Sequence, residues 1–187
     1  MQLDDFIEFE TAAWTPIVIV VTSSYGVGGP PMGCGMFRQL CDAILEQQRS
    51  HILDGIRYFM LGLGDSTYTT YFQNPARIDE ALTVAGAMRV GELGKADASG
   101  PQLELIQGWM DEELWPNLKQ VVVNWKVGDG EEDVCRKAKE RTWDLCLKVL
   151  PQLSEEVEDG SKDNGNVMLK WIAVAVLVIA ILLMKTN

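Results

Sequence analysis

The sequence predicts an α/β fold in which helices flank a parallel sheet, followed by one C-terminal transmembrane helix. Short β-branched segments that end near glycines alternate with segments whose apolar residues recur at helical spacing, which predicts the α/β fold. A long uncharged segment near the end of the 187-residue chain predicts the transmembrane helix. Sixteen Lys and Arg against 27 Asp and Glu give a net charge of −11. This balance excludes proteins that bind a nucleic-acid backbone, because those proteins need a basic surface.

The first part of the chain reads as strands and helices in alternation. Residues 16–22 (PIVIVVT) form the first predicted strand, since a continuous β-branched run is typical of a buried strand in a parallel sheet. Apolar residues at helical spacing predict a helix over 37–49. A second strand follows at 56–63, a helix at 76–85 and a third strand at 88–93. This order predicts right-handed βαβ units.

Two amphipathic helices are expected after the third strand. The first covers 103–118 and should stop near Pro116, because proline breaks a helix interior. The second covers 131–150, where apolar residues again recur on one side. The segment 121–130 between them could be a short strand or a loop.

The four cysteines are expected to act as small buried hydrophobic residues. They are Cys34, Cys41, Cys135 and Cys146. They form no CxxC pair and no metal-ligand spacing, and the chain has one histidine, so a zinc site is not expected. Cys135 and Cys146 lie about three helical turns apart and should both face a core.

The C-terminus predicts a membrane anchor. Residues 171–184 (WIAVAVLVIAILLM) carry no charge, and starting at residue 167 the segment is eighteen residues, or roughly 27 Å as a helix. The alternative is a buried core helix. The preceding residues 154–166 are polar and acidic and read as a linker. Because the N-terminus shows no secretory signal, we expect a cytosolic domain on the endoplasmic reticulum or mitochondrial outer membrane.

Three loops follow the predicted strands and could carry function. They cover 22–35, 62–74 and about 94–100, and ligands of open parallel sheets bind at the carboxyl ends of the strands. Tyr25 and Tyr68 on the first two loops could hold a flat ring by stacking. The glycines beside them allow close approach of the backbone.

Four segments of the chain resemble one known family. They are TSSYGVGGPP at 22–31, LGLGDSTYTTYF at 61–72, DEALTVAGAMRVGELGKAD at 79–97 and WMDEELWP at 109–116. Their sequence and order resemble the FMN-binding, flavodoxin-like module of diflavin reductases, such as cytochrome reductases and methionine synthase reductase. The resemblance covers about residues 1–120 and implies a flavodoxin-like sheet.

The resemblance also implies which residues would contact FMN. Those residues are Ser23, Ser24, Tyr25, Gly26, Leu63, Gly64, Asp65, Tyr68, Phe72 and Asp97. Tyr68 would stack on the flavin ring, the first loop would line its other side, and Asp97 would contact the flavin or its ribityl edge. The stretch from Tyr68 to Phe72 is one residue longer than the usual loop of the family, which leaves the register of Tyr71 and Phe72 open.

The sequence departs from that family at its start. Members of the family begin with a central strand, a phosphate loop of the form T-x-T-G-x-[STA] and a helix, and no such motif occurs here. We therefore expect an N-terminally incomplete domain that lacks the first strand and phosphate loop and exposes one edge of strand 17–21. FMN binding should be weak or absent, because charge-assisted phosphate contacts contribute strongly to affinity.

These inferences predict a membrane-anchored, FMN-dependent electron-transfer protein, a one-electron carrier between a reductase and an acceptor. We expect no FAD- or NADPH-binding region in this chain, so a separate reductase would supply electrons, and the acidic stretches 111–113 and 129–133 could dock a basic acceptor. The alternative is an interaction module that has lost FMN. A hydrolase fits poorly, because Ser66 lacks a G-x-S-x-G context. The expected domains are 1–120 (flavodoxin-like), 121–153 (helical), 154–166 (linker) and 167–184 (anchor).

Overall fold

The computed structural model describes residues 2–8, 14–124 and 131–150. The chain divides into two units, Met1–Pro151 and Gln152–Asn187, and all of these described residues lie in the first. The predicted linker (154–166) and anchor (167–184) lie outside the described residues. Among the described helices, none combines the length and the apolar character needed to cross a membrane.

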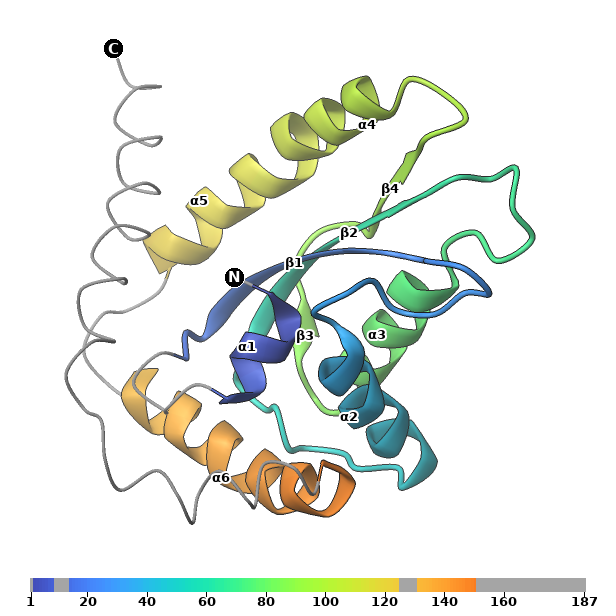
Figure 1. Ribbon diagram of the computed structural model, residues 1–187. Coiled ribbons are helices and arrows are strands. Elements are labelled where there is room, and N and C mark those ends of the chain that lie inside the picture. Colours follow the sequence, from blue (N-terminus) through green and yellow to red (C-terminus); the bar gives the residue numbers. More distant parts are fainter. Residues whose placement is uncertain (1, 9–13, 125–130, 151–187) are drawn as a thin grey trace, which may run out of the picture. The chain divides into compact units, whose positions relative to one another are not determined.

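A parallel sheet forms the centre of the first unit (Figure 1). Its strands are β1 (Ile17–Ser23), β2 (Arg57–Gly64), β3 (Met88–Arg89) and β4 (Gly94–Asp97). Strand β2 lies between its neighbours, since it pairs with β1 over seven residues and with β3 and β4 on its other edge. The prediction of a parallel sheet is therefore confirmed.

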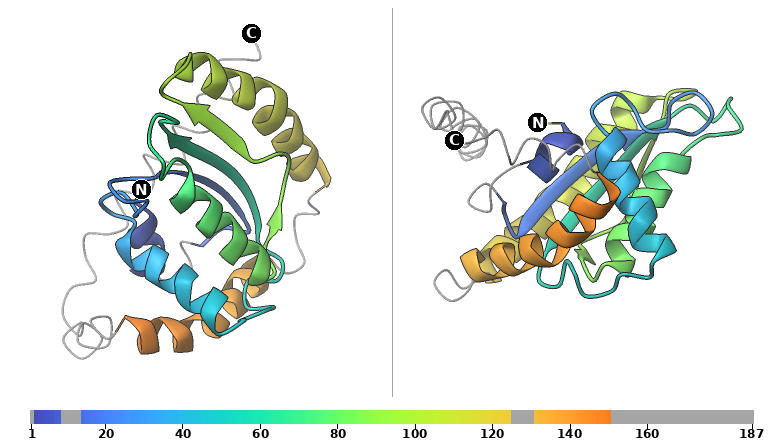
Figure 2. Two further views of the ribbon diagram at one scale, coloured as in Figure 1. Left: turned by 90° about the vertical axis from the view of Figure 1, so that its right-hand side faces the viewer. Right: turned by 60° about the horizontal axis from the view of Figure 1, so that its bottom comes forward.

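Helices cover both faces of this sheet. They are α1 (Leu3–Glu8), α2 (Gly35–Glu46), α3 (Gln73–Val84), α4 (Gln102–Trp109), the π-helical turn η2 (Met110–Leu114), α5 (Trp115–Asn124) and α6 (Glu131–Val149). Helices α2 and α3 lie on one face, and α4, η2 and α5 lie on the other (Figure 2). Helix α6 packs beside α2 and buries Cys135 and Cys146, as expected from their spacing.

The expected third strand at 88–93 is wrong in detail, because this segment and the loop after it form two short strands. The backbone turns at Gly91, whose φ of +73° lies in the left-handed region that favours glycine. The Glu113 carboxylate accepts the N–H of Glu92 at 3.0 Å and holds this turn. The chain therefore returns to β2 as β4, which occupies part of the expected loop 94–100.

The expected stop of the helix near Pro116 is also wrong. Helical structure runs without a break from Gln102 to Asn124, and the π-helical turn ends at Leu114, two residues before the proline. A wider turn relieves the clash between a proline ring and the preceding turn, and proline needs no hydrogen-bond acceptor for its nitrogen. Residues 121–124, for which the sequence allowed either a short strand or a loop, continue this helix.

The outer edge of β1 is unpaired within the part of the chain that the structure describes. Ile19 and Val21 are 46% and 49% exposed on this strand. A cavity of about 440 Å³ adjoins it and is lined mostly by apolar side chains of β1, α1 and α2, among them Phe6 and Phe37. This edge is a surface on which another strand could pair.

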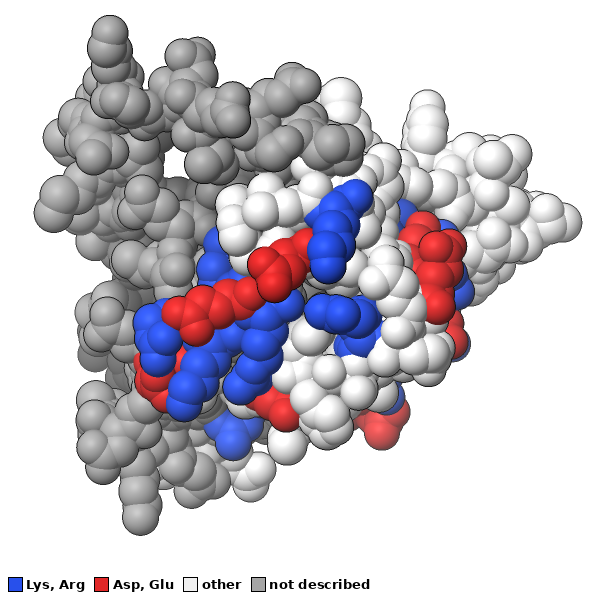
Figure 3. Space-filling view, turned by 90° about the horizontal axis from the view of Figure 1, so that it is seen from below, with Lys and Arg blue, Asp and Glu red and all other residues white. Residues whose placement is uncertain are grey.

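The underside of the unit carries charges of both signs (Figure 3). On α6, Arg136 pairs with Asp133 and Glu140, and Lys137 also pairs with Asp133. Exposed pairs of this kind contribute little to stability, so we assign these side chains to a solvated helix surface.

Candidate functional site

The three loops expected to carry function come together at one edge of the sheet. They follow β1, β2 and β4, and because all three strands run parallel, their carboxyl ends lie at the same edge (Figure 1). The loop after β1 covers 24–34, and the loop after β2 covers 65–72. This is the edge where open α/β sheets bind their ligands.

Direct hydrogen bonds join the first loop to the second loop and to the start of α3. The Thr70 hydroxyl donates to the Gly26 carbonyl at 3.1 Å, and the Asn74 N–H donates to the Ser24 hydroxyl at 3.0 Å. At Gly28, where φ is +88°, a Cβ atom would meet the Gln73 side chain at 2.1 Å. The positive φ favours glycine here, and the Gln73 side chain packs directly against the first loop.

Tyr25 and Tyr68 project from these joined loops into solvent. Their side chains are 76% and 65% exposed. Hydrogen bonds fix the backbone near both positions, because Tyr25 and Gly29 exchange two of 2.9 Å, and the Tyr68 N–H donates to the Asp65 carbonyl at 3.1 Å. Two exposed aromatic rings on mutually fixed loops suit the binding of a flat ring.

Asp97 joins the second loop to the third. Its Oδ1 accepts the N–H of Ser66 at 2.9 Å and the N–H of Ser99 at 3.0 Å, and the hydroxyls of these serines lie 2.8 Å apart. Hydrogen bonds from Ser66 are the main cause that lowers the pKa of Asp97 well below its ordinary value of 3.8. Asp97 thus has a structural role, holding the second and third loops together, that the sequence did not indicate.

We expect the Asp97→Ala variant to be less stable than the wild type in a way that depends on pH. The folded pKa of Asp97 is lowered, so its contribution is complete above the ordinary value of 3.8 and is lost as pH falls below it toward the folded pKa. Urea unfolding of both chains at several pH values measures this difference. A difference that grows as pH falls would contradict the assignment.

Two of the other expected contact residues point into the protein. The Leu63 side chain packs against the core cluster around Phe59 and Trp109, so only the Leu63 backbone is available to a ligand. Phe72 is 7% exposed and has a φ of +63°, which is unusual for a bulky residue. The Lys95 ammonium group lies 4.9 Å from its ring centre. Phe72 therefore supports the second loop from inside.

Two more expected residues, Gly64 at the end of β2 and Asp65 at the start of the loop, make local contacts. Gly64 accepts the N–H of Ala98 at 2.7 Å, and a Cβ atom on Gly64 would meet the Tyr71 ring at 2.9 Å. Asp65 accepts the backbone N–H and the hydroxyl of Thr67 at 2.9 and 2.6 Å, which closes a tight turn before Tyr68.

Sequence reasoning missed two residues beneath the loops, Asn74 and Arg38. Asn74 is fully buried at the start of α3, and its side-chain oxygen accepts a hydrogen bond of 2.8 Å from Arg38 Nη1. The only signal in the sequence is an asparagine in a first helical turn, which is also common at exposed helix ends. Burial was needed to distinguish the two cases.

The thiols and the acidic residues offer no second site in the described ranges. Burial raises the pKa of Cys34, and it raises that of Cys146 to about 11. The thiolate is the reactive form, so these cysteines are unsuited to nucleophilic chemistry. Within residues 2–8, 14–124 and 131–150, no three side chains of His, Cys, Asp or Glu are grouped as metal ligands.

Comparison with known proteins agrees with this arrangement. The family described as flavodoxin matches residues 2–109, which is more than half of the chain. The chain belongs to the flavodoxin family. This membership accounts for the parallel sheet and for a ligand edge at the carboxyl ends of its strands.

Several curated proteins are similar to this flavodoxin-family chain. It is 38% identical to the bifunctional cytochrome P450/NADPH–P450 reductase of Bacillus cereus over 52% of the chain and 9% of that protein. It is 34% identical to the NADPH–cytochrome P450 reductase of Saccharomyces cerevisiae over 57% of the chain and 15% of that protein. It is 28% identical to human methionine synthase reductase over 89% of the chain and 24% of that protein. The chain thus spans less than a quarter of their length.

Proposed function

We propose that this chain is an FMN-dependent one-electron carrier that works between a reductase and an acceptor protein. The observation that carries the proposal is the pair of exposed tyrosines, Tyr25 and Tyr68, on loops that are hydrogen-bonded to each other at the carboxyl edge of a flavodoxin-family sheet. Exposed aromatic rings on a hydrogen-bonded backbone suit stacking on an isoalloxazine, because the loops need little further ordering when the ring binds.

The described residues fit the ring end of FMN. Tyr68 would lie against one face of the ring, and Ser23 to Gly26 would approach its other side with backbone groups. Asp97 and Thr70 would keep the loops in register through their bonds to Ser66 and Gly26. FMN, when bound, supplies the capacity to take up and release single electrons, while the chain binds and orients it.

The partners and the location are part of the same proposal. The relatives named P450 reductase and methionine synthase reductase suggest a reductase on one side and a protein acceptor on the other. Residues 167–184 would tether the unit to a membrane, an inference from their apolar sequence, which carries no charge over 171–184. Tethering would raise the local concentration of partners in the same membrane.

We expect FMN to bind weakly, with little help from its phosphate. The chain has no T-x-T-G motif, and the loops described above offer Tyr25 and Tyr68 for the ring rather than cations for a phosphate. Riboflavin, which has the ring but no phosphate, should therefore bind about as tightly as FMN. A phosphate held by charge-assisted hydrogen bonds would instead favour FMN strongly.

Replacing Tyr68 by alanine should weaken flavin binding by roughly tenfold, because stacking of aromatic rings contributes about 0.5–1.5 kcal/mol beyond its buried area. The measurement is quenching of FMN fluorescence by the full chain in mild detergent, with riboflavin titrated in parallel. Val123→Ala is the control, since Val123 is 83% exposed on α5, a helix of the opposite face. Its affinity should equal that of the wild type.

Two results would contradict the proposal. Wild-type chain that is folded by circular dichroism but quenches neither flavin would exclude FMN binding. Equal affinities of wild type and Tyr68→Ala would exclude the assigned ring site.

The second candidate function is an interaction module that does not use flavin. The unpaired edge of β1 and the half-exposed side chains of Ile19 and Val21 favour it, because such an edge can accept a partner strand. The flavin titration decides between the two functions. A folded chain that binds no flavin supports the module, whereas measurable binding lost in Tyr68→Ala supports the carrier.

A further inference from the structure

Asn74 is the second residue of α3 and is fully buried beneath the first two loops. Its side-chain Nδ2 donates to the Thr22 hydroxyl at 3.2 Å and to the Ser23 carbonyl at 3.0 Å. Its backbone N–H donates to the Ser24 hydroxyl at 3.0 Å. One residue at the start of α3 thus binds three consecutive residues, the last two of β1 and the first of the loop that follows it.

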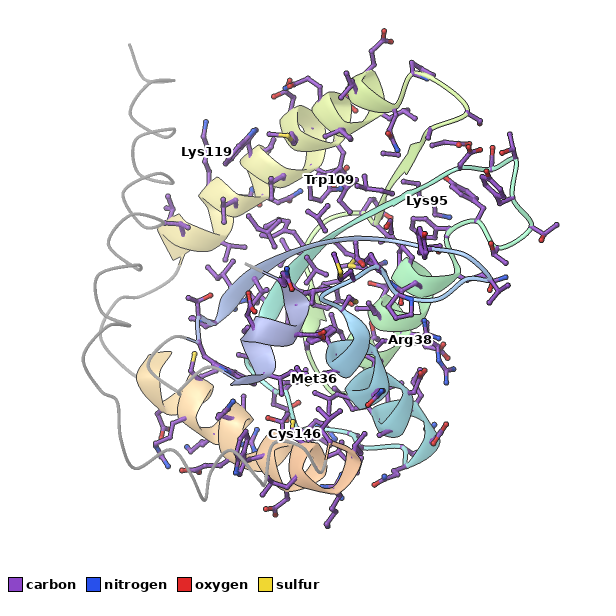
Figure 4. The ribbon with its side chains drawn as sticks, viewed as in Figure 1. Met36, Arg38, Lys95, Trp109, Lys119 and Cys146 are labelled. Atoms are coloured by element: carbon purple, nitrogen blue, oxygen red, sulfur yellow. The ribbon has the colours of Figure 1, made fainter. Side chains whose placement is uncertain are left out.

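The orientation of the Asn74 amide is determined from its other side. Its Oδ1 accepts a hydrogen bond of 2.8 Å from Arg38 Nη1 (Arg38 is labelled in Figure 4). Arg38 is itself held by Asp42, which accepts two bonds of 3.1 Å from Arg38 Nε and one of 2.8 Å from Arg77. With a cation on one side, the amide oxygen must face Arg38 and the NH₂ group must face β1.

Only a side-chain amide satisfies all of these partners. Aspartate would keep the acceptor for Arg38 but would place an oxygen against the Ser23 carbonyl. Alanine would leave the buried Thr22 hydroxyl and the Arg38 guanidinium without this partner, and unpaired buried polar groups are costly. The residue that follows these three contacts is Tyr25, one of the two exposed rings.

We propose that Asn74 is a positioning residue of the flavin site. It holds Thr22 to Ser24 in one conformation and thereby presents Tyr25 and the loop backbone to the ring. The identity of the ligand in this inference rests on the proposed function, whereas the effect of Asn74 on the loop can be measured without a flavin.

The test compares Asn74→Asp with wild type in two measurements on the full chain in mild detergent. Hydrogen exchange followed by mass spectrometry, without flavin, should show faster exchange in peptides covering 22–31 and unchanged exchange in α4 and α5. FMN titration should show affinity about tenfold weaker, as expected for loss of a buried hydrogen-bond network. The visible circular dichroism of bound FMN should also change, because it reports how the ring is held.

Asn117→Ala is the matched control. Asn117 Nδ2 donates to the Glu113 carbonyl at 2.7 Å on the opposite face of the sheet, so this variant also loses an asparagine bond but should leave both measurements unchanged. Where Asn74→Asp does not fold, Ser24→Ala gives the same two measurements, because it removes only the acceptor of the Asn74 N–H.

The outcomes separate the two proposals. Faster exchange of 22–31 together with weaker FMN binding supports the positioning role. Unchanged exchange overturns it, and so does faster exchange with unchanged FMN affinity. If wild-type chain binds no flavin, the carrier function and the positioning role in a flavin site both fail, while the exchange measurement still establishes whether Asn74 orders the loop.

Discussion

Replacing Trp109 by alanine lowers the free energy of unfolding by about 3–5 kcal/mol, the range for removing a buried aromatic side chain. Trp109 is 8% exposed and packs against Phe59, Leu61 and Ala96 of the sheet (Figure 4). Its indole N–H also donates to the Glu92 carbonyl at 3.1 Å, which ties the turn between β3 and β4. Urea unfolding followed by circular dichroism measures the effect.

Leu103→Ala is the control for this prediction. Leu103 lies on the same helix but is 80% exposed, so its removal should change the free energy of unfolding by less than about 0.5 kcal/mol. Equal losses for the two variants would show that α4 is stabilised by something other than burial of Trp109 against the sheet.

Replacing Gly62 by alanine should cost about 3 kcal/mol, at the upper end for overpacking of a core. A Cβ atom at this position would lie 2.1 Å from the Phe72 ring and 2.7 Å from Pro75 Cβ. Phe72 has to move, and because it ends the second loop, the position of Tyr68 changes with it. Urea unfolding and FMN titration should therefore both be affected.

Gly108→Ala is the matched glycine variant. A Cβ atom on Gly108, in α4, meets no atom within 4 Å, so alanine should stabilise the chain by about 0.5–1 kcal/mol through its better helix propensity. The two substitutions are chemically identical and should have opposite signs. A Gly62→Ala chain as stable as the wild type would contradict the packing described for Phe72.

The sequence predicted β1, β2, α2 and α3 because each has a long periodic or β-branched pattern that tertiary contacts reinforce. It did not predict that helical structure passes Pro116, since the π-helical turn that accommodates the proline has no pattern of its own. It also missed the division of 88–97 into β3 and β4, which depends on a bond between Glu92 and Glu113, twenty-one residues apart.

The same distinction holds at the site. Tyr25 and Tyr68 could be predicted because aromatic residues beside glycines after strands are visible in the chain. Asp97 is a predicted contact of the flavin, and the structure adds its hydrogen bonds to Ser66 and Ser99, which the sequence did not indicate. Asn74 was not predicted at all.

By itself the sequence determined the order of strands and helices, the carboxyl edge where a ligand would bind, and the aromatic residues of two loops. These properties follow from local periodicity and from the direction of parallel strands. Only the tertiary structure decided which side chains are exposed at this edge and which hold the loops. That decision depends on burial and on hydrogen bonds between distant residues, such as Asn74 with Thr22 and Arg38, which no local pattern encodes.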